Sequence, residues 1–371
     1  QAFHNELADP IAGLITLSLH TDHDFSQYDL DAPVTDVTVP GRVLMAPMTG
    51  VTDLPFRLLA SRLGAAYVAT EMVAARELDR RGVDVLVLEA ADRVGGRSLA
   101  ETSVLGSRLD LGGQWIGHDH DRVTALAAEL GLTKYTMHTG LLPGIVDGSR
   151  RLSPVSGPVL TSVVAIAAAD LLSRLGVTRR WNSATVHGAL RKVPGRTARR
   201  LLELIALISW TADLDRHSVH AMADMIRKQH GALTMLSTKG GAQEALLVEG
   251  AGTIAERLAA QLGDRVQTGR RVTAIERDEG GVTVHTASGS IRARKVIVTV
   301  PPPVARSIEH MPPLPADHVL LQQNMYMGSV YKAIAVYDRP FWRERRGGEF
   351  MVLTEPGFAV FDSTAPGGPG H

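Results

Sequence analysis

The clearest hydrophobic pattern in the chain is a run of apolar and β-branched residues at Val83–Leu88. The run is too short for a stable helix, so it predicts a buried strand of a parallel sheet. Similar runs at 271–275 and 295–300 predict two further strands. Alternation over 281–293, on either side of a Ser-Gly pair, predicts a β-hairpin between them, and this pattern indicates an α/β domain.

A second block, from about 140 to 235, is rich in helix formers and predicts helices over 159–175, 198–210 and 219–228. Trp210 and the methionines near it are typical of a core, with the lining of an apolar cavity as the alternative. The longest apolar stretch, Val159–Leu172, contains two hydroxyl residues and one acid and is shorter than the ~20 residues of a membrane span. We therefore expect a core or interfacial helix and no span.

Composition narrows the class of protein. With 371 residues, 44% of them hydrophobic and 21% charged, the chain can form about two domains with a sizeable core. The 39 basic and 39 acidic residues balance, so the chain has no net positive charge that would attract nucleic acid. The absence of cysteine excludes disulfides, thiolate metal sites, a thiol nucleophile and a flavin attached through cysteine. With no secretory signal visible at the start, we expect a cytoplasmic protein.

Segments 20–24 and 118–121 combine histidines with aspartates, the residue types of metal sites. Such side chains on polar loops are usually solvated and imply no fixed geometry, so we predict no metal. Asp119 or Asp121 is instead expected to cap a helix over 122–130 that ends at Gly131.

The candidate ligand-binding residues directly follow the Val83–Leu88 run. In a nucleotide-binding βαβ unit, an acid at the tip of the second strand accepts hydrogen bonds from ribose hydroxyls, and Glu89 occupies that place. Gly95 and Gly96 would let the backbone approach a ligand, and Arg97 can meet a phosphate or a flavin ring. The alternative is a solvent-exposed strand end followed by a turn.

Residues 85–97 (VLVLEAADRVGGR) and 109–117 (LDLGGQWIG) together resemble the flavin-containing amine oxidase family, the monoamine and polyamine oxidases. The resemblance runs over about 74–363. It implies an FAD-binding Rossmann-like α/β domain at 79–135 and 240–310. It also implies a mixed α+β substrate-binding domain at 136–239 and 311–371, with residues 1–41 as an unassigned extension. Because the family continues past the position of His371, the resemblance implies an incomplete substrate domain.

The same resemblance implies the roles of further residues. The loop at Gly113, Gln114 and Trp115 would approach the flavin, with a core tryptophan as the alternative, and Val272 would meet the adenine through its backbone. Lys332 would bond, through water, to the flavin N5 and assist the reaction with oxygen. Lys332 lies within an apolar segment, 327–337, that predicts a strand, so its ammonium needs a polar partner or a lowered pKa. The alternative is an edge lysine that faces water.

The N-terminal part departs from that family. Residues 42–78 resemble the opening βα unit of the tRNA-dihydrouridine synthases, FMN enzymes built on a TIM barrel, and would stand in for a lost first βα unit. The amine oxidases carry G-x-G-x-x-G there, but the matching positions are Ala66, Val68 and Glu71. A branched side chain and a carboxylate would then meet the diphosphate, and like charges at about 4 Å cost a few kcal/mol. We expect a strand at 66–69, a helix at 71–81 and weak, non-covalent FAD binding.

The leading functional prediction is an oxidoreductase. The resemblance implies that FAD takes a hydride from the carbon beside an amine nitrogen, giving an imine, and that oxygen is reduced to hydrogen peroxide. The small-molecule amine is not specified, and we expect this chain to be impaired. A non-catalytic fragment or interaction module that keeps only the scaffold is the first alternative. A fragment of an FMN-dependent tRNA-dihydrouridine synthase is the third hypothesis, against which the lack of cysteine and the balanced charge argue.

Overall fold

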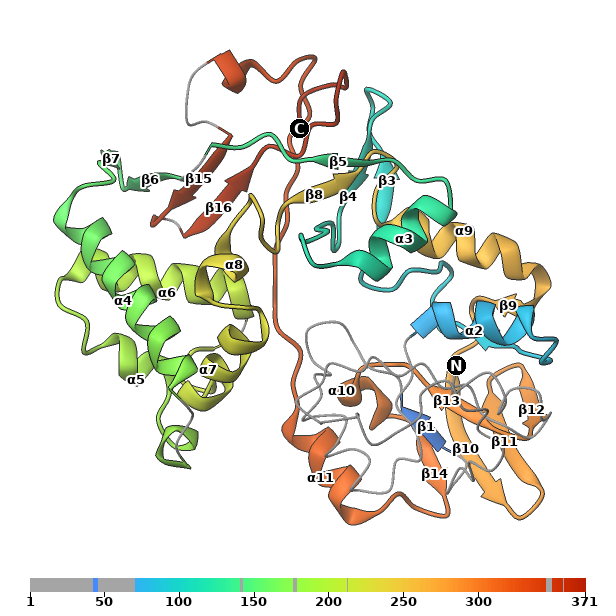
Figure 1. Ribbon diagram of the computed structural model, residues 1–371. Coiled ribbons are helices and arrows are strands. Elements are labelled where there is room, and N and C mark those ends of the chain that lie inside the picture. The colour runs from blue at the N-terminus through green and yellow to red at the C-terminus, as the bar shows by residue number, and fades with distance from the viewer. Residues whose placement is uncertain are drawn as a thin grey trace, which may run out of the picture. The chain divides into compact units, whose positions relative to one another are not determined.

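The computed structural model describes residues 43–45, 71–140, 143–175, 179–211, 213–344, 349–355 and 357–371. The chain divides into two compact units (Figure 1). Unit 1 comprises Gln1–Gly96 and Ala255–Met327, and unit 2 comprises Arg97–Ile254 and Gly328–His371. Each unit is described by itself. The predicted strand at 66–69 and the segment 20–24 lie outside the described residues.

Unit 1 contains parallel strand pairs of the kind that the apolar runs predict. Strand β1 (Val43–Met45) pairs in parallel with β13 (Val296–Val298), and β2 (Val87–Leu88) pairs in parallel with β9 (Val266–Gln267). The predicted hairpin is confirmed as the antiparallel pair β11 (Gly281–Thr286) and β12 (Gly289–Ala293). These two strands belong to a four-stranded sheet of order β12-β11-β10-β14, which adds β10 (Val272–Asp278) and β14 (Glu309–Met311).

The core of unit 1 lies between these strands and helix α2 (Glu71–Arg80), which the sequence predicts over 71–81. The chain leaves α2 through Gly82 at a φ of +73°, where glycine is favoured. Leu78 of α2 is buried against Val83 and Val85. A second cluster is centred on Ile275 of β10. Two short helices, α10 (Pro302–Ala305) and α11 (Ala316–Asn324), complete the described part of unit 1.

The strands in the described part of unit 2 form three small sheets. Antiparallel pairs are formed by β3 (Ala100–Thr102) with β4 (Arg108–Asp110) and by β5 (Lys134–Thr136) with β8 (Ala245–Leu247). The third sheet has the order β16-β15-β6-β7, and its strands are β6 (Gly144–Asp147), β7 (Arg150–Leu152), β15 (Phe350–Leu353) and β16 (Phe358–Phe361). Helix α9 (Gly252–Leu262) begins in unit 2 and ends in unit 1.

The predicted helical block is confirmed within unit 2 (Figure 1). Ser218 caps α7 by accepting the N–H of Ala221 at 3.0 Å, and the buried residues of α6 recur with helical spacing. Trp210 and Met222 pack on a buried cluster, as expected of core residues. The block comprises α4 (Gly157–Arg174), α5 (Val186–Leu190), α6 (Arg196–Trp210), α7 (Val219–Lys228) and α8 (Ala232–Leu236).

Two local predictions are wrong. Helix α3 (Asp121–Glu129) begins after His120, which has no side-chain cap bond, so neither Asp119 nor Asp121 is the N-cap. The segment 327–337 has no strand, and only Tyr337 forms an isolated bridge. A strand needs a neighbouring sheet edge, and in the described structure this segment bonds to the end of a helix instead. The Ser329 N–H donates to the carbonyl of Thr211 at 2.9 Å.

Candidate functional site

In unit 1, Glu89 directly follows the parallel strand β2. Its N–H donates to the carbonyl of Gln267 at 2.9 Å, and its own carbonyl accepts the N–H of Arg270 at 2.8 Å. The carboxylate Oε1 accepts the N–H of Ala91 at 2.8 Å. These three bonds hold the acid at the carboxyl end of a parallel strand, the place where open α/β sheets bind ligands.

Val272, the residue predicted to lie against adenine, belongs to the same part of unit 1. It packs with Leu88 of β2 on the buried Ile275 cluster. The loop before β10 is tied to the segment after Glu89 by the Gly269 N–H, which donates to the carbonyl of Ala91 at 2.7 Å. The fold therefore brings the chain around Glu89 and the start of β10 together.

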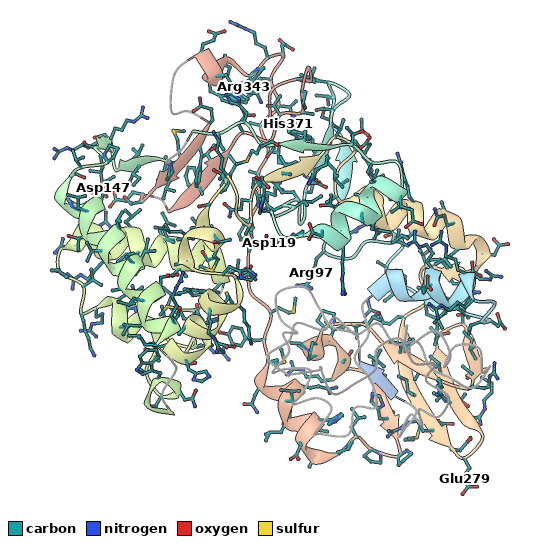
Figure 2. All side chains as sticks on the ribbon, viewed as in Figure 1. Arg97, Asp119, Asp147, Glu279, Arg343 and His371 are labelled. Atoms are coloured by element: carbon teal, nitrogen blue, oxygen red, sulfur yellow. The ribbon has the colours of Figure 1, made fainter. Side chains whose placement is uncertain are left out.

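The predicted Gly-Gly turn has the backbone that its sequence requires. Gly95 and Gly96 have φ values of +94° and +51°, which favour glycine. The Arg93 guanidinium closes the turn by donating to the carbonyls of Val94 and Gly96 at 3.2 and 2.9 Å. Arg97, the first residue of unit 2, is exposed and is marked in Figure 2.

In unit 2, the amine of Lys332 is held by three oxygen acceptors. Its Nζ donates to the backbone carbonyl of Asp110, to the carbonyl of Gly112 at 3.2 Å and to the side-chain Oε1 of Gln114. An ammonium has three N–H donors, so this set can use all of them. Although Lys332 as a residue is exposed, desolvation of its amine lowers the pKa to about 8, and the charge of Asp110 opposes that shift.

Asp110 connects this cluster to helix α9. Its buried carboxylate accepts the N–H groups of Ala251 and Gly252 at 2.9 and 3.3 Å, at the start of that helix. Burial raises the pKa of Asp110 above its usual 3.8, while these two backbone bonds and the charges of Lys332 and Arg108 oppose the rise. The carboxylate of Asp110 thus fixes the position of this residue, and the backbone carbonyl of the same residue accepts the hydrogen bond from Lys332.

The two glycines after Asp110 differ in what surrounds them. A Cβ added to Gly112 would overlap the backbone carbonyl of Arg97, so the turn itself requires glycine there. A Cβ on Gly113 would meet only the Ser98 Oγ, at 3.9 Å. Gly113 therefore has open space on the side where a Cβ would stand. Its N–H donates to the carbonyl of Arg97 at 3.1 Å.

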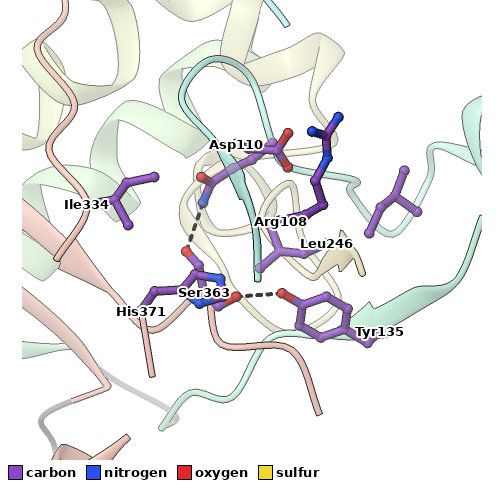
Figure 3. A pocket seen from close by; sticks show the side chains of 9 residues that line it. Arg108, Asp110, Tyr135, Leu246, Ile334, Ser363 and His371 are labelled. Carbon is purple, nitrogen blue, oxygen red and sulfur yellow. Dashed lines mark hydrogen bonds between the residues drawn. The ribbon is translucent and has the colours of Figure 1, made fainter. Parts of the chain in front are cut away.

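Gln114 is buried and links Lys332 to the C-terminal segment. Its Nε2 donates to the Ser363 Oγ at 3.3 Å, and the hydroxyl of Tyr135 donates to the carbonyl of Ser363 at 2.5 Å (Figure 3). Burial raises the pKa of Tyr135, which keeps the phenol protonated as a donor. The group lines a cavity of about 10 Å³, about the room of one water, with Arg108, Asp110, Leu246, Leu247, Ile334 and His371.

Trp115 is half-buried and packs within unit 2. Its ring meets Phe361 of β16 edge-on, with centroids 5.1 Å apart, and Phe361 stacks on Phe350 of β15. This packing favours the core interpretation of the tryptophan, while its part in flavin binding stays a prediction.

An ion pair between the half-buried Arg343 and the buried Asp362 anchors the chain next to Ser363. Arg343 donates to both carboxylate oxygens of Asp362, at 2.6 and 3.1 Å, and to the carbonyl of Thr364. Burial favours a raised pKa for Asp362, but the bonds from Arg343 and Thr364 outweigh it and leave the pKa below its usual value. His371 bonds to the same Thr364, and Figure 2 shows it near Arg343.

Four residues of this cluster are additions to the predicted site: Asp110, Gly112, Tyr135 and Ser363. Asp110 has a readable signal, because an acid between two leucines must find a partner when that segment is buried. Tyr135 and Ser363 have no such signal, since their bond joins segments that are 228 positions apart. Among the described residues, no group of three or more histidines and acids is arranged to hold a metal.

Comparison with protein families gives two matches. The model of the flavin containing amine oxidoreductases matches residues 72–228 and 212–371. The dihydrouridine synthase model matches residues 44–91. Both resemblances inferred from the sequence are therefore confirmed, with the amine oxidoreductase match covering most of the chain.

Comparisons with individual proteins point to the same family. The chain is 33% identical over 344 residues to a putative flavin-containing monoamine oxidase, AofH, of Mycobacterium tuberculosis, covering 86% of this chain and 74% of that protein. It is 29% identical to the human flavin-containing amine oxidase B, covering 80% and 61%. Cyclohexylamine oxidase from Brevibacterium oxydans has a TM-score of 0.71 at 28% identity, covering 81% and 71%. Putrescine oxidase bound to putrescine has the same fold, with a TM-score of 0.72 at 22% identity, covering 89% and 74%.

Proposed function

Because the chain belongs to the flavin containing amine oxidoreductase family, we propose that it oxidises a primary or secondary amine to an imine and reduces oxygen to hydrogen peroxide. Membership of this family predicts FAD as the cofactor. The observation that carries the proposal is the amine of Lys332, held by Asp110, Gly112 and Gln114 and lowered in pKa to about 8. A lysine with such a pKa can hold or release a proton near neutral pH.

The described part of unit 1 fits an adenine dinucleotide in its donor and acceptor chemistry. Glu89 uses Oε1 for Ala91, and its second carboxylate oxygen would accept a ribose hydroxyl. Gly95 and Gly96 have positive φ angles and carry no side chains, so the backbone of this turn can approach a ligand. Val272 follows the loop bonded to the Glu89 segment and would offer its backbone to the adenine.

The residues at the expected diphosphate position support weak binding of FAD. Of the three positions that replace the family's glycines, Ala66 and Val68 lie outside the described residues, and Glu71 is the first residue of α2. A carboxylate in the first turn of a helix interacts favourably with that helix and competes with a phosphate for the same place. We infer that the chain binds FAD weakly and that its turnover is impaired for this reason.

The protein's own residues would do the following. Glu89, Val272 and the Gly95–Gly96 turn would hold the nucleotide, and Gly113 would leave room for the flavin ring. When bound, FAD supplies the group that accepts the hydride and passes the electrons to oxygen. Lys332 would place positive charge and a proton donor at that reaction, and Gln114 orients its amine. Ser363 in turn holds the amide of Gln114.

The test is amine-dependent peroxide release by the purified chain with added FAD, using an aromatic, an alicyclic and an aliphatic amine. Lys332→Met is expected to lower peroxide release by about a hundred-fold or more while leaving flavin uptake, read from its absorbance, unchanged. Lys192→Met, which removes an exposed lysine of unit 2, is the matched control and should keep full activity. Equal activity of wild type and Lys332→Met would refute the role of Lys332.

The scaffold-only alternative is favoured by one feature of the same site. All three donors of Lys332 can be used by acceptors of the protein itself, so the cluster can serve folding alone. Thermal unfolding with and without FAD separates the two functions, because a ligand that binds the native state raises its stability. No peroxide with any amine, together with unfolding that FAD leaves unchanged, would replace the enzyme proposal by the scaffold.

A further inference from the structure

The outward face of helix α4 is an uninterrupted apolar stripe. Eight exposed residues recur with the spacing of one helix face, and the exposed fractions of Leu160, Val164 and Leu175 are 50%, 67% and 74%. We call this set the α4 stripe. Its members are Leu160, Val163, Val164, Ala167, Ala168, Leu171, Leu172 and Leu175.

The opposite face of α4 is packed and fixed in place. Ser162 and Ser173 are buried, and the helix contacts α6, α7 and α8 of unit 2 (Figure 1). Asp170 accepts the Ala232 N–H at 2.7 Å and the Nε of Arg174 at 2.9 Å. By length and composition, with a mean hydropathy of 1.3 over 18 residues, this helix could cross a membrane. Its packed face instead suits a helix that lies along a surface.

The charges around the stripe are one-sided. Residues 148–180 contain a single acid, Asp170, and five arginines, which gives a local net charge of +4 within a chain that is neutral overall. The side chains of Arg150 and Arg151, before the helix, and of Arg174, in its last turn, are exposed. The remaining two arginines follow the helix at 179 and 180. Basic residues therefore flank both ends of the stripe.

This charge pattern decides between two occupants. A second copy of the chain, related by two-fold symmetry, would set the stripe against itself. If the two helices ran antiparallel, Arg150 and Arg151 of one copy would approach Arg174 of the other; if parallel, each arginine would approach its own equivalent. Either arrangement brings like charges together, which opposes association. An anionic lipid surface offers acyl chains to the stripe and phosphates to the arginines.

We propose that the α4 stripe docks this chain on the surface of an anionic bilayer. The helix lies in the interface, with its leucines and valines at the boundary of headgroups and acyl chains and its flanking arginines on lipid phosphates. Binding then depends on anionic lipid and weakens as salt screens the arginines. The proposal is independent of the amine oxidase activity.

Flotation of the full chain with vesicles tests the docking. Wild type is expected to float with phosphatidylcholine vesicles that contain one third phosphatidylglycerol, and about ten-fold less with phosphatidylcholine alone or at high salt. The double variant Val164→Gln/Leu171→Gln should lose about ten-fold or more of the binding to anionic vesicles. Val104→Gln/Leu207→Gln removes two exposed apolar residues of unit 2 outside the stripe and should bind as wild type does.

A second variant keeps the stripe intact. Arg150→Gln/Arg151→Gln should bind anionic vesicles more weakly and lose most of the salt dependence, and it tests the proposal even if the glutamine variant of the stripe fails to fold. Failure of wild type to bind either vesicle would overturn the docking. So would equal loss in the stripe variant and its control. Concentration-dependent dimers that only the stripe variant abolishes, without vesicle binding, would make the stripe an interface between copies instead.

Discussion

Lys332 meets Asp110 through the backbone carbonyl of Asp110, while the Asp110 carboxylate faces the start of helix α9. The two ionisable groups are therefore neighbours without forming a direct salt bridge. Burial is the largest cause in both pKa shifts, lowering that of Lys332 and raising that of Asp110, and the attraction between the two charges only reduces each shift. Each group is thus displaced toward its neutral form.

The lowered pKa of Lys332 predicts an unusual pH dependence of stability. Between pH 8 and the ordinary lysine value of 10.5, the unfolded chain binds more protons at this residue than the folded chain. The free energy of unfolding therefore rises with pH across that window. After discounting for solvent exposure, we expect a gain of about 1 kcal/mol.

Urea denaturation from pH 7 to pH 11 measures this gain as the difference between wild type and Lys332→Met, in which other titrating groups cancel. A flat difference between wild type and Lys332→Met would show that burial does not lower the pKa of the Lys332 amine.

Gly112 and Gly113 provide a matched pair of substitutions. Gly112→Ala should destabilise the protein by about 3 kcal/mol, because its Cβ would overlap the carbonyl of Arg97. Gly113→Ala should change stability by less than about 0.5 kcal/mol, since its nearest neighbour is 3.9 Å away. If the flavin occupies the open side of Gly113, this second variant keeps its fold and loses FAD affinity.

Thermal unfolding and a flavin titration on the two alanine variants separate these effects. Equal stability of the two variants would contradict the different surroundings of the glycines. Unchanged FAD affinity in Gly113→Ala would place the flavin elsewhere.

The sequence predicts those parts of the fold whose signal is local. The hairpin at 281–293 and helix α6 follow from hydrophobic periodicity. In the hairpin every second residue faces the core, and in α6 every third or fourth residue does, so the signal lies within each segment. The strand predicted around Lys332 fails because a strand depends on an edge supplied by a distant segment.

The candidate site likewise has residues that the sequence reveals and contacts that it does not. Glu89 and the Gly95–Gly96 turn are readable because the strand, the acid and the glycines follow one another in the sequence. The bonds from Lys332 to the carbonyls of Asp110 and Gly112 cannot be read from sequence, because every residue has a carbonyl and only folding selects which of them meet the amine.

Asp110 is predicted to act as a cap for α9. Asp110→Ala removes the acceptor of both the Ala251 and Gly252 N–H groups and should cost about 2 kcal/mol of unfolding free energy. Asp110→Asn keeps one acceptor oxygen and should cost about half as much. Lys332 bonds to the backbone of this residue, so its amine should remain enclosed in both variants.

Urea denaturation gives the two stability losses. The pH dependence of stability between pH 8 and 10.5 then reports whether the lysine is still enclosed. Loss of that dependence in Asp110→Asn would mean that the carboxylate, and not the backbone, positions Lys332.

Glu71 is predicted to limit FAD affinity. It is the first residue of α2 and occupies the third position at which the family carries a glycine, so its carboxylate would face the diphosphate. Glu71→Gln removes the like charge and keeps the size of the side chain. Because salt screens part of the repulsion, we expect FAD to bind about ten-fold more tightly.

Glu77→Gln on the same helix is the matched control. Its carboxylate pairs with Arg81 at 2.6 Å, four residues away, so its loss should leave FAD affinity within about two-fold of wild type. Titration of each protein with FAD, followed by the quenching of flavin fluorescence at low and high salt, measures the three affinities. The gain from Glu71→Gln should shrink at high salt, because screening already weakens the repulsion in wild type. A gain of the same size in both variants would trace the effect to the overall charge of the helix, and no gain in either would place the diphosphate away from the start of α2.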